Sequence, residues 1–496
     1  MALIKKSDIL SLAKSILSYN FEADKKLEET LVRTEVCVFN DGAQAHELLE
    51  KAQKFLTVQS PTDLQLSFYS LAGVIENQLY NFKASDKHFK KAIKYAKTAN
   101  GETLSELYID YAGTLINEAE ISAATQIISK TQPLLEKSGN EKLLARLQCR
   151  EAYLYLICAD YKQAYEVFFQ VEKKMQALLV NQPTSKDYYF QTLIYAGLGS
   201  VFEKIGDIQR SVQAYLKVID ICTTHNIKTR LAWHYLNVGK AFMALQYFNE
   251  AENYFQKVIQ NSDDLSINAR VFATTNLGFC YYKKNNFEAA RTYFEKAELF
   301  FNNNEKNSLD NLSQLAYWKG LVYKAEKNLE QTETHWAKAL DYAKSAQNFA
   351  QQAILCREIS EFYAAKNDYV EAYHYQRIHV DFVKKQNEES KQNTLRDLEL
   401  KYDLERQKQE IEMLRIQTNQ LQLKALRAQM NPHFIFNALN SIRALVDENP
   451  TRARTSITEL SNILRSSMQA EKLETVPLER ELNIVKDYLA LEKMRF

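Results

Sequence analysis

Glycine and proline are scarce in this chain, whose 496 residues include only 11 Gly and 6 Pro. These two residues mark turns, bulges and helix ends, so a chain that holds few of them spends most of its length in long regular elements. The remaining composition, 46% hydrophobic and 25% charged, is typical of an ordinary soluble protein. We therefore expect an all-α fold.

The chain also lacks an excess of one charge, a long apolar run and paired cysteines. Lys plus Arg total 63 against 62 for Asp plus Glu, so no positive field attracts nucleic acid or an anionic membrane. No apolar run approaches the roughly 18 residues of a membrane helix, and Lys5, Lys6 and Asp8 interrupt any signal-peptide core. The six cysteines form no CxxC pair, which disfavours a zinc or redox site. We expect a cytosolic protein with reduced, buried thiols and no membrane or nucleic-acid partner.

One pattern of small and aromatic residues recurs through the middle of the chain. In its two clearest copies the matching residues are Gly239, Phe242, Phe248, Ala251, Phe255 and Val258 with Gly278, Tyr281, Phe287, Ala290, Phe294 and Ala297. The same frame fits copies at Gly199, Gly320, Gly73, Gly113, Ala152 and Ser360, the last four more weakly. Small residues let two helices approach closely, and we expect the aromatic residues to fill the gap to the next repeat. The pattern resembles the tetratricopeptide repeat family.

This resemblance implies a tetratricopeptide-like α-solenoid of about eight repeats over residues 61–380. Residues 1–60 show helical stretches but no repeat, and we expect them to form an N-terminal helical cap. Stacked repeats leave a concave groove, so a peptide, a protein or a small ligand is the expected partner of this region. Most of the 29 Tyr and 25 Phe are expected to pack between repeats.

Residues 381–430 contain no Gly or Pro and predict one continuous helix. Two series with a seven-residue spacing form a candidate seam, namely Leu400, Gln407, Leu414, Leu421 and Ala428 with Leu404, Ile411, Thr418 and Ala425. Such a seam predicts a coiled coil with a second copy of the chain. The polar residues Gln407 and Thr418 would weaken this coiled coil. The alternative is a solvated linker helix.

Residues 431–496 predict a helical hairpin. A helix that starts near Pro432 has one apolar stripe, made of Ile435, Leu439, Ile442 and Val446. His433, Asn437 and Asn440 follow the spacing i, i+4, i+7 on another face. After a turn at Asn449 and Pro450, a second helix is expected from Arg452 to Met468, with the inward residues Ile457, Leu460 and Leu464. Two such hairpins would form a dimeric four-helix bundle.

This segment closely resembles the dimerisation and phosphoacceptor region of LytS-type sensor histidine kinases. The core motif of that family is matched by Asn431, Pro432, His433, Phe434, Ile435, Phe436 and Asn437, and two later elements by Leu478 to Leu482 and Glu492 to Phe496. The resemblance implies a homodimer in a two-component system. ATP with Mg²⁺ on a catalytic domain would phosphorylate His433, and a response regulator, such as one of the LytTR type, would accept the phosphoryl group.

The resemblance also suggests roles for two neighbours of the histidine. By analogy with other histidine kinases, Asn437 would position a water molecule for phosphatase chemistry. Phe434 stands where many histidine kinases have an acid that accepts a proton, so the base must come from elsewhere. The imidazole of His433 is itself suited to the task, because it is neutral and nucleophilic near its ordinary pKa of about 6.5. The remaining seven histidines have no neighbours at metal-ligand spacing, and we expect no metal site.

No glycine occurs after Gly320, so the C-terminal region lacks a glycine-rich phosphate loop. We expect no ATP to bind to this chain and an ATP-binding domain to follow in the complete protein. Two alternatives remain open. A non-enzymatic tetratricopeptide adaptor or peptide-responsive regulator could dimerise through its C-terminal helices, with His433 only capping a helix beside Pro432. Nucleic-acid binding is disfavoured by the nine basic and nine acidic residues of 431–496.

Overall fold

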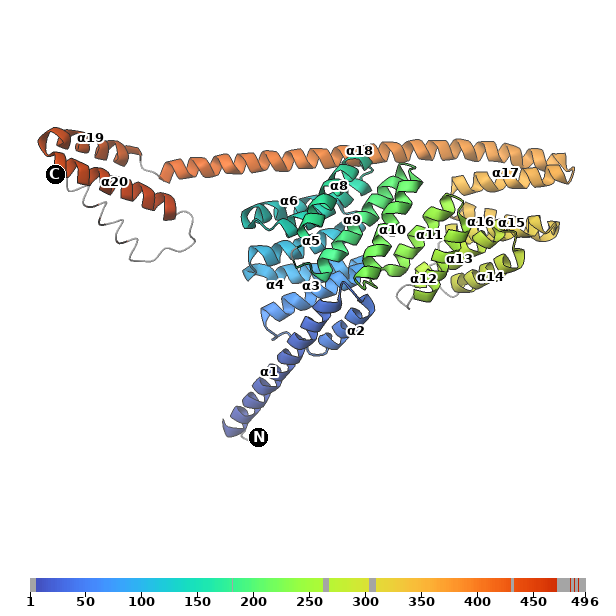
Figure 1. Cartoon of the computed structure of the whole chain (residues 1–496), viewed down its shortest axis with the longest axis horizontal. Helices are drawn as coiled ribbons and strands as arrows, with labels where there is room; N and C mark the ends of the chain where they lie inside the picture. The colour runs from blue at the N-terminus through green and yellow to red at the C-terminus, as the bar shows by residue number, and fades with distance from the viewer. Residues whose placement is uncertain are drawn as a thin grey trace, which may run out of the picture. The chain divides into compact units, whose positions relative to one another are not determined.

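The computed structural model of the protein describes residues 6–180, 182–261, 267–302, 309–429 and 432–470, with single positions at 482, 486 and 489 (Figure 1). Every regular element within these ranges is a helix, and no strand occurs among them. The expected all-α class is therefore confirmed. The chain divides into two compact units, Met1–Lys408 and Gln409–Phe496.

The first compact unit is a series of helix pairs that begins with α1 (Lys6–Cys37) and α2 (Gly42–Gln53). Eight further pairs follow among the described residues, with a short 3-10 helix, η1 (Ala96–Thr98), after α4. They are α3 (Thr62–Gln78) with α4 (Phe82–Tyr95), α5 (Gly101–Asn117) with α6 (Ile121–Ser138), α7 (Glu141–Ile157) with α8 (Tyr161–Leu178), α9 (Ser185–Lys204) with α10 (Ile208–Thr224), α11 (Leu231–Ala244) with α12 (Phe248–Asn261), α13 (Ile267–Lys283) with α14 (Phe287–Asn302), α15 (Leu309–Ala325) with α16 (Leu329–Ser345), and α17 (Phe349–Ala365) with α18 (Tyr369–Gln429).

A glycine of the first helix lies against an aromatic ring of the second helix in five of these pairs. The two residues are always sixteen positions apart: Gly73 and Phe89, Gly199 and Tyr215, Gly239 and Phe255, Gly278 and Phe294, Gly320 and Trp336. A Cβ at Gly278 would lie only 2.5 Å from the ring of Phe294. The hydrogen side chain of glycine therefore lets the two backbones close over a buried ring.

The expected place of the aromatic residues is confirmed for Phe248, and Phe255 packs within its own pair as well as toward the next one. The ring of Phe248 meets that of Phe279 in the next pair, at a centroid distance of 6.5 Å. Phe255 fills the interior of its own pair against Gly239. The same ring belongs to the buried cluster that includes Ala273 and Leu277 of the next pair.

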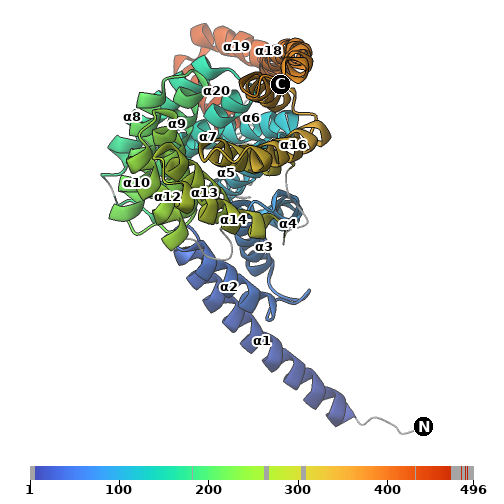
Figure 2. The ribbon, with the colours of Figure 1, turned by 90° about the vertical axis from the view of Figure 1, so that its right-hand side faces the viewer.

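The helix pairs curve so that the N-terminal helices meet the connection between α10 and α11 (Figure 2). The carbonyl oxygen of Asn40 accepts hydrogen bonds from the backbone N–H groups of Lys228, at 2.6 Å, and Thr229, at 3.3 Å. The Lys228 ammonium lies 3.0 Å from the Asp41 carboxylate, and Arg230 donates to the carbonyl oxygen of Asn77 at 2.8 Å. These contacts join segments more than 150 residues apart.

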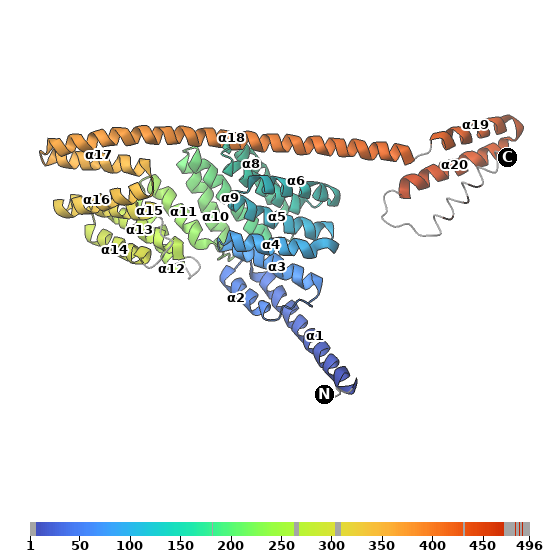
Figure 3. The same ribbon diagram turned by 180° about the vertical axis from the view of Figure 1, so that it is seen from behind.

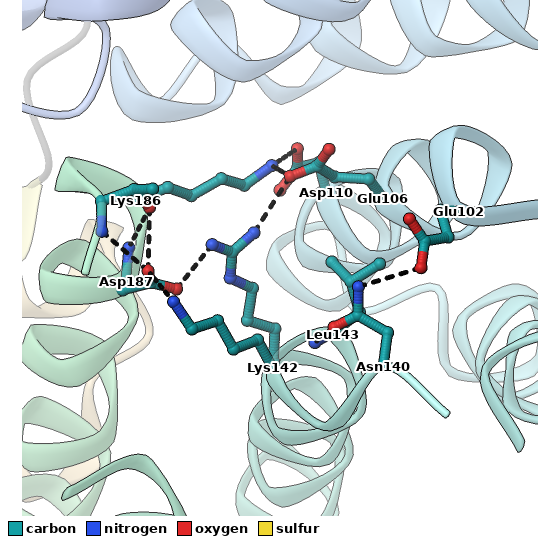
Figure 4. A network of polar contacts seen from close by, with 10 residues as sticks. Glu102, Glu106, Asp110, Asn140, Lys142, Leu143, Lys186 and Asp187 are labelled. Carbon is teal, nitrogen blue, oxygen red and sulfur yellow. Dashed lines mark hydrogen bonds and ion pairs between the residues drawn. The ribbon is translucent and has the colours of Figure 1, made fainter. Parts of the chain in front are cut away.

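A polar network links the first helices of three consecutive pairs, α5, α7 and α9 (Figure 4). Arg146 of α7 forms ion pairs with Asp187 of α9 at 2.7 Å and with Glu106 of α5 at 3.0 Å. Lys186 of α9 adds contacts of 3.0 Å to Glu106 and 2.7 Å to Asp110. Because its members come from three repeats, the network fixes how the repeats are oriented relative to one another.

Helix α18 begins as the second helix of the last pair, α17–α18, and contains 61 residues (Figures 1 and 3). It passes residue 380 without a break, because no Gly or Pro interrupts it. Within the first compact unit it packs against the pair α7–α8: Lys401 lies 3.2 Å from Asp160, and Lys408 contacts Glu151 and Tyr155. Leu404, between these two lysines, is 1% exposed and belongs to the core of the repeats. This residue of the predicted seam is thus covered by the chain's own repeats.

Candidate phosphoacceptor hairpin

The second compact unit contains a hairpin of α19 (Pro432–Glu448) and α20 (Pro450–Ala470). Both helices start with proline, whose fixed φ suits the first helical position. Asn449 caps α20, since its side-chain oxygen accepts a hydrogen bond from the N–H of Arg452 at 3.1 Å. Its own N–H donates to the carbonyl of Leu445 at 2.8 Å. The predicted turn at Asn449 and Pro450 is confirmed, and α20 starts two residues before the predicted Arg452.

Small and apolar side chains fill the interior of the hairpin. The buried residues are Ala438, Ile442, Ala453, Ser456 and Leu460. The inward orientation predicted for Leu460 is confirmed, while that of Ile457 is wrong, because this side chain is half exposed. Ala453, Ser456 and Leu460 share one helical face, and Ile457 lies about 100° away from Ser456 around the helix. The side chain of Leu464 lies outside the described residues.

Part of the apolar stripe predicted for the first helix stays uncovered within one chain. Ile442 is buried and Ile435 half-buried, but Leu439 and Val446 are each about half exposed. Phe436, a member of the family motif, is 67% exposed. Three large apolar side chains of α19 and Ile457 of α20 thus face away from the hairpin interior, which is unusual for a surface that meets only water.

His433 is the second residue of α19, so its backbone lies in the first turn of that helix. The side chains of residues 423–434, including Pro432, His433 and Phe434, lie outside the described part of the structure, as does Asn431 as a whole. Asn437 is half-buried and Asn440 exposed. Their helical spacing of i, i+4 and i+7 places His433, Asn437 and Asn440 on one side of α19. The roles of these residues and of the motif at 478–482 and 492–496 stay predictions.

The first turn of α19 offers a favourable environment for an anion. Unpaired backbone N–H groups at a helix N-terminus carry partial positive charge and stabilise an anion placed there. The backbone of His433 belongs to this turn, and its role as a phosphoacceptor stays a prediction.

Two histidines of the repeats, His234 and His335, are buried. Burial, assisted by the charge of Arg230, lowers the pKa of His234 to about 3, and burial with the charge of Lys319 lowers that of His335 to about 4. Both imidazoles therefore stay neutral and packed. All six cysteines are free thiols, five of them buried and Cys37 half-buried. Burial raises the pKa of Cys149 and of Cys222 to about 12, so these thiols stay protonated.

Two regions of the chain are similar to known protein families. Residues 421–496 match the family model "Histidine kinase", and residues 193–225, 235–264 and 274–299 match "Tetratricopeptide repeat". The sensor histidine kinase YpdA of Escherichia coli is 42% identical over 85 residues, which are 17% of this chain and 15% of YpdA. The sensor histidine kinase/phosphatase LytS of Staphylococcus aureus is 44% identical over 75 residues, 15% of this chain and 13% of LytS. The chain thus spans about one seventh of the length of these relatives.

Solved structures similar to the chain include the apo form of RapI, with a TM-score of 0.48 and 14% identity over 73% of this chain and 98% of RapI. The apo form of the quorum sensor NprR from B. thuringiensis has the same TM-score and identity and covers 73% of this chain and 99% of NprR. No helix of the described residues combines the length and the apolar composition that a bilayer crossing needs. The chain thus combines segments that match the tetratricopeptide repeat model with a C-terminal segment that matches the histidine kinase model and is similar to LytS-type sensor proteins.

Proposed function

We propose that this chain is the sensing and phosphoacceptor part of a cytosolic sensor histidine kinase. The observation that carries the proposal is the motif of residues 431–437 at the start of a helical hairpin, within a segment that matches the histidine kinase family. Unpaired cysteines agree with a reducing compartment. The repeats sense a peptide, protein or small ligand, and the hairpin carries the phosphoryl group.

In the proposed reaction a catalytic domain supplies ATP with Mg²⁺. A ring nitrogen of His433 attacks the γ-phosphorus, the bond to the bridging oxygen of ADP breaks, and a phosphorus–nitrogen bond forms. An aspartate of a response regulator, such as one of the LytTR type, then attacks the phosphorus and returns a neutral imidazole. Asn437, one turn from His433, orients a water molecule that hydrolyses the aspartyl phosphate. The name of the S. aureus relative, a kinase/phosphatase, agrees with this second role.

The proposed protein acts as a homodimer. Phe436, Leu439, Val446 and Ile457 leave an apolar surface on the hairpin, and a second hairpin would cover it in a four-helix bundle. A two-fold axis would bring the same surface of each copy into contact. Burial of this surface is the driving force for pairing.

Helix α18 is the proposed connection between sensing and phosphorylation. It is one continuous helix from Tyr369 to Gln429, and Gln429 lies two residues before Asn431, where the motif begins. Up to Lys408 it is held against the pair α7–α8 by the buried Leu404 and by the ion pairs of Lys401 and Lys408. A ligand that changes the curvature of the repeats would shift these contacts and so move or release the helix.

The test is phosphorylation of the chain by the catalytic domain of a LytS-type kinase added with Mg·ATP. We expect acid-labile phosphate on the wild type and none on His433→Gln. His374→Gln, which changes an exposed histidine of α18, is the matched control and should be labelled like the wild type. Label that persists in His433→Gln would overturn the assignment and favour a non-enzymatic adaptor.

A further inference from the structure

A cavity of about 350 Å³ lies where the N-terminal helices meet the connection between α10 and α11. Its walls come from α2, the end of α3 and the start of α11, with Asn261 of α12 at one side. Ligand pockets in proteins are commonly of this size and lie where separate structural segments meet. The cavity is far in sequence from the phosphoacceptor hairpin and belongs entirely to the first compact unit.

Several polar atoms that border this cavity have no hydrogen-bond partner among the described residues. They are both amide atoms of Gln78, the hydroxyl of Thr229 and Nε of Arg230. Gln78 is 5% and Thr229 6% exposed, so water reaches neither side chain freely. The oxygens of both side chains lie close to Gly42, each 3.6 Å from where its Cβ would be. Buried donors and acceptors are normally paired, and such a group of unpaired ones indicates that something else binds them.

Arg230 places a positive charge in the wall between this cavity and a smaller one that Asn77, Tyr153 and Tyr189 line. Its guanidinium donates to the carbonyl of Asn77 and stacks on the ring of Tyr80 at 4.7 Å, but no described carboxylate lies within ion-pair distance of it. The nearby Lys228 is already paired with Asp41 at 3.0 Å. Arg230 has a left-handed backbone with φ of 60°, which is uncommon for this residue type.

Aromatic rings form a third part of the wall. Tyr80 and Trp233 lie with their ring centroids 5.3 Å apart, one from each side of the junction. The cavity thus presents a guanidinium for an anion, a primary amide that can both donate and accept, and an aromatic surface for an apolar group. These three features together match the C-terminal end of a peptide.

We propose that this cavity binds the C-terminal residue of a short peptide, with its carboxylate at Arg230, its last amide at Gln78 and its side chain against Tyr80 and Trp233. The proposal rests on the sensing role given to the repeats under the proposed function and names the class of ligand. A peptide bound here would contact both α3 and α11. It would therefore strengthen the junction that holds the curved array together and alter the support that the repeats give to α18.

The test is native mass spectrometry of the full chain with a library of Gly-Gly-Xaa tripeptides, each as a free acid and as a C-terminal amide. We expect free acids with an apolar Xaa to bind, and amidation to weaken binding about tenfold or more, since it removes the anion. Gln78→Leu and Arg230→Met should each weaken binding by a similar factor. The matched control is Gln351→Leu, which changes a buried glutamine of α17 whose side-chain nitrogen is also unpartnered.

Thermal unfolding of the unbound chains separates binding from structure. Gln78→Leu should melt no lower than the wild type, because an apolar side chain replaces an unpaired polar one. Absence of bound tripeptide at millimolar concentration, equal binding of acids and amides, or binding unchanged in Gln78→Leu and Arg230→Met would overturn the proposal. The measurement involves no phosphoryl transfer, so its failure leaves the role of His433 untouched, and loss of labelling at His433 would not affect it.

Discussion

The guanidinium of Arg146 lies 2.7 Å from the carboxylate of Asp187, and both side chains are almost wholly withdrawn from water. Asp187 also accepts a hydrogen bond from the backbone N–H of Thr184 at 2.8 Å and completes the capping box at the start of α9. One carboxylate therefore serves two purposes, since it begins a helix and neutralises a buried charge of the preceding pair. Because Arg146 reaches Glu106 as well, α5, α7 and α9 share this arrangement.

Replacement of Asp187 by asparagine should destabilise the repeats strongly. The change leaves the buried guanidinium of Arg146 without its closest partner, and breaking a buried ion pair from one side costs about 3–5 kcal/mol. The measurement is urea unfolding followed by circular dichroism. Asp220→Asn is the matched control, because Asp220 is well exposed and lies 3.8 Å from Lys217, and it should change stability by less than about 1 kcal/mol. Equal effects of the two changes would contradict the role given to the buried pair.

The same carboxylate should make stability depend on acid pH. Burial alone would raise the pKa of Asp187, but the hydrogen bonds from Thr184 and Arg146 outweigh burial and hold the pKa below its ordinary value of 3.8. Its contribution is complete above that value and is lost as the pH falls through the lowered pKa of the folded state. We expect the Tm of the wild type to fall more steeply below about pH 4 than that of Asp187→Asn. Parallel curves in differential scanning calorimetry would show that another group controls the acid transition.

The contact between Gly278 and Phe294 gives a test of the repeat packing. A methyl group at Gly278 would lie 2.5 Å from the ring, so Gly278→Ala forces the buried Phe294 to move and should cost about 1–3 kcal/mol. Gly101→Ala is the matched control, because no atom lies within 4 Å of its would-be Cβ, and it should be neutral or slightly stabilising. Thermal unfolding measures both. A Gly278→Ala protein as stable as the wild type would mean that the helices can separate at little cost.

The repeats could be predicted from the sequence because each of these pairs packs its two helices with a small residue and an aromatic residue at a fixed spacing. Gly278 and Phe294 recur as Gly239 and Phe255 because two neighbouring helices decide the contact by themselves. Leu404 followed a seven-residue pattern just as regularly, yet its environment is set by repeats some 250 residues earlier in the chain. A pattern within one helix shows which side is apolar, but it does not show which other element covers that side.

The cavity at Gln78, Thr229 and Arg230 had no signal in the sequence for a related reason. These residues follow no period and no motif, and they are brought together only by the curvature of the array. The start of α19 at Pro432 and the turn before α20 at Asn449 were predictable because proline and asparagine act locally on helix ends. The exposure of Ile457 was not, since the rotation of α20 depends on which small residues meet across the hairpin.

Leu404 and Leu421 belong to the same predicted seam but should behave differently in a dimer. Leu404 is buried against the repeats, whereas Leu421 is 65% exposed within one chain. We therefore expect Leu421→Cys to form an intermolecular disulfide under mild oxidation and Leu404→Cys to stay monomeric on a non-reducing gel. The wild type is the control for the native cysteines, five of which are buried. Efficient cross-linking of Leu404→Cys would mean that α18 leaves the repeats and pairs with its copy over the whole seam. Cross-linking of neither variant would remove the parallel pairing of α18 from the proposed dimer.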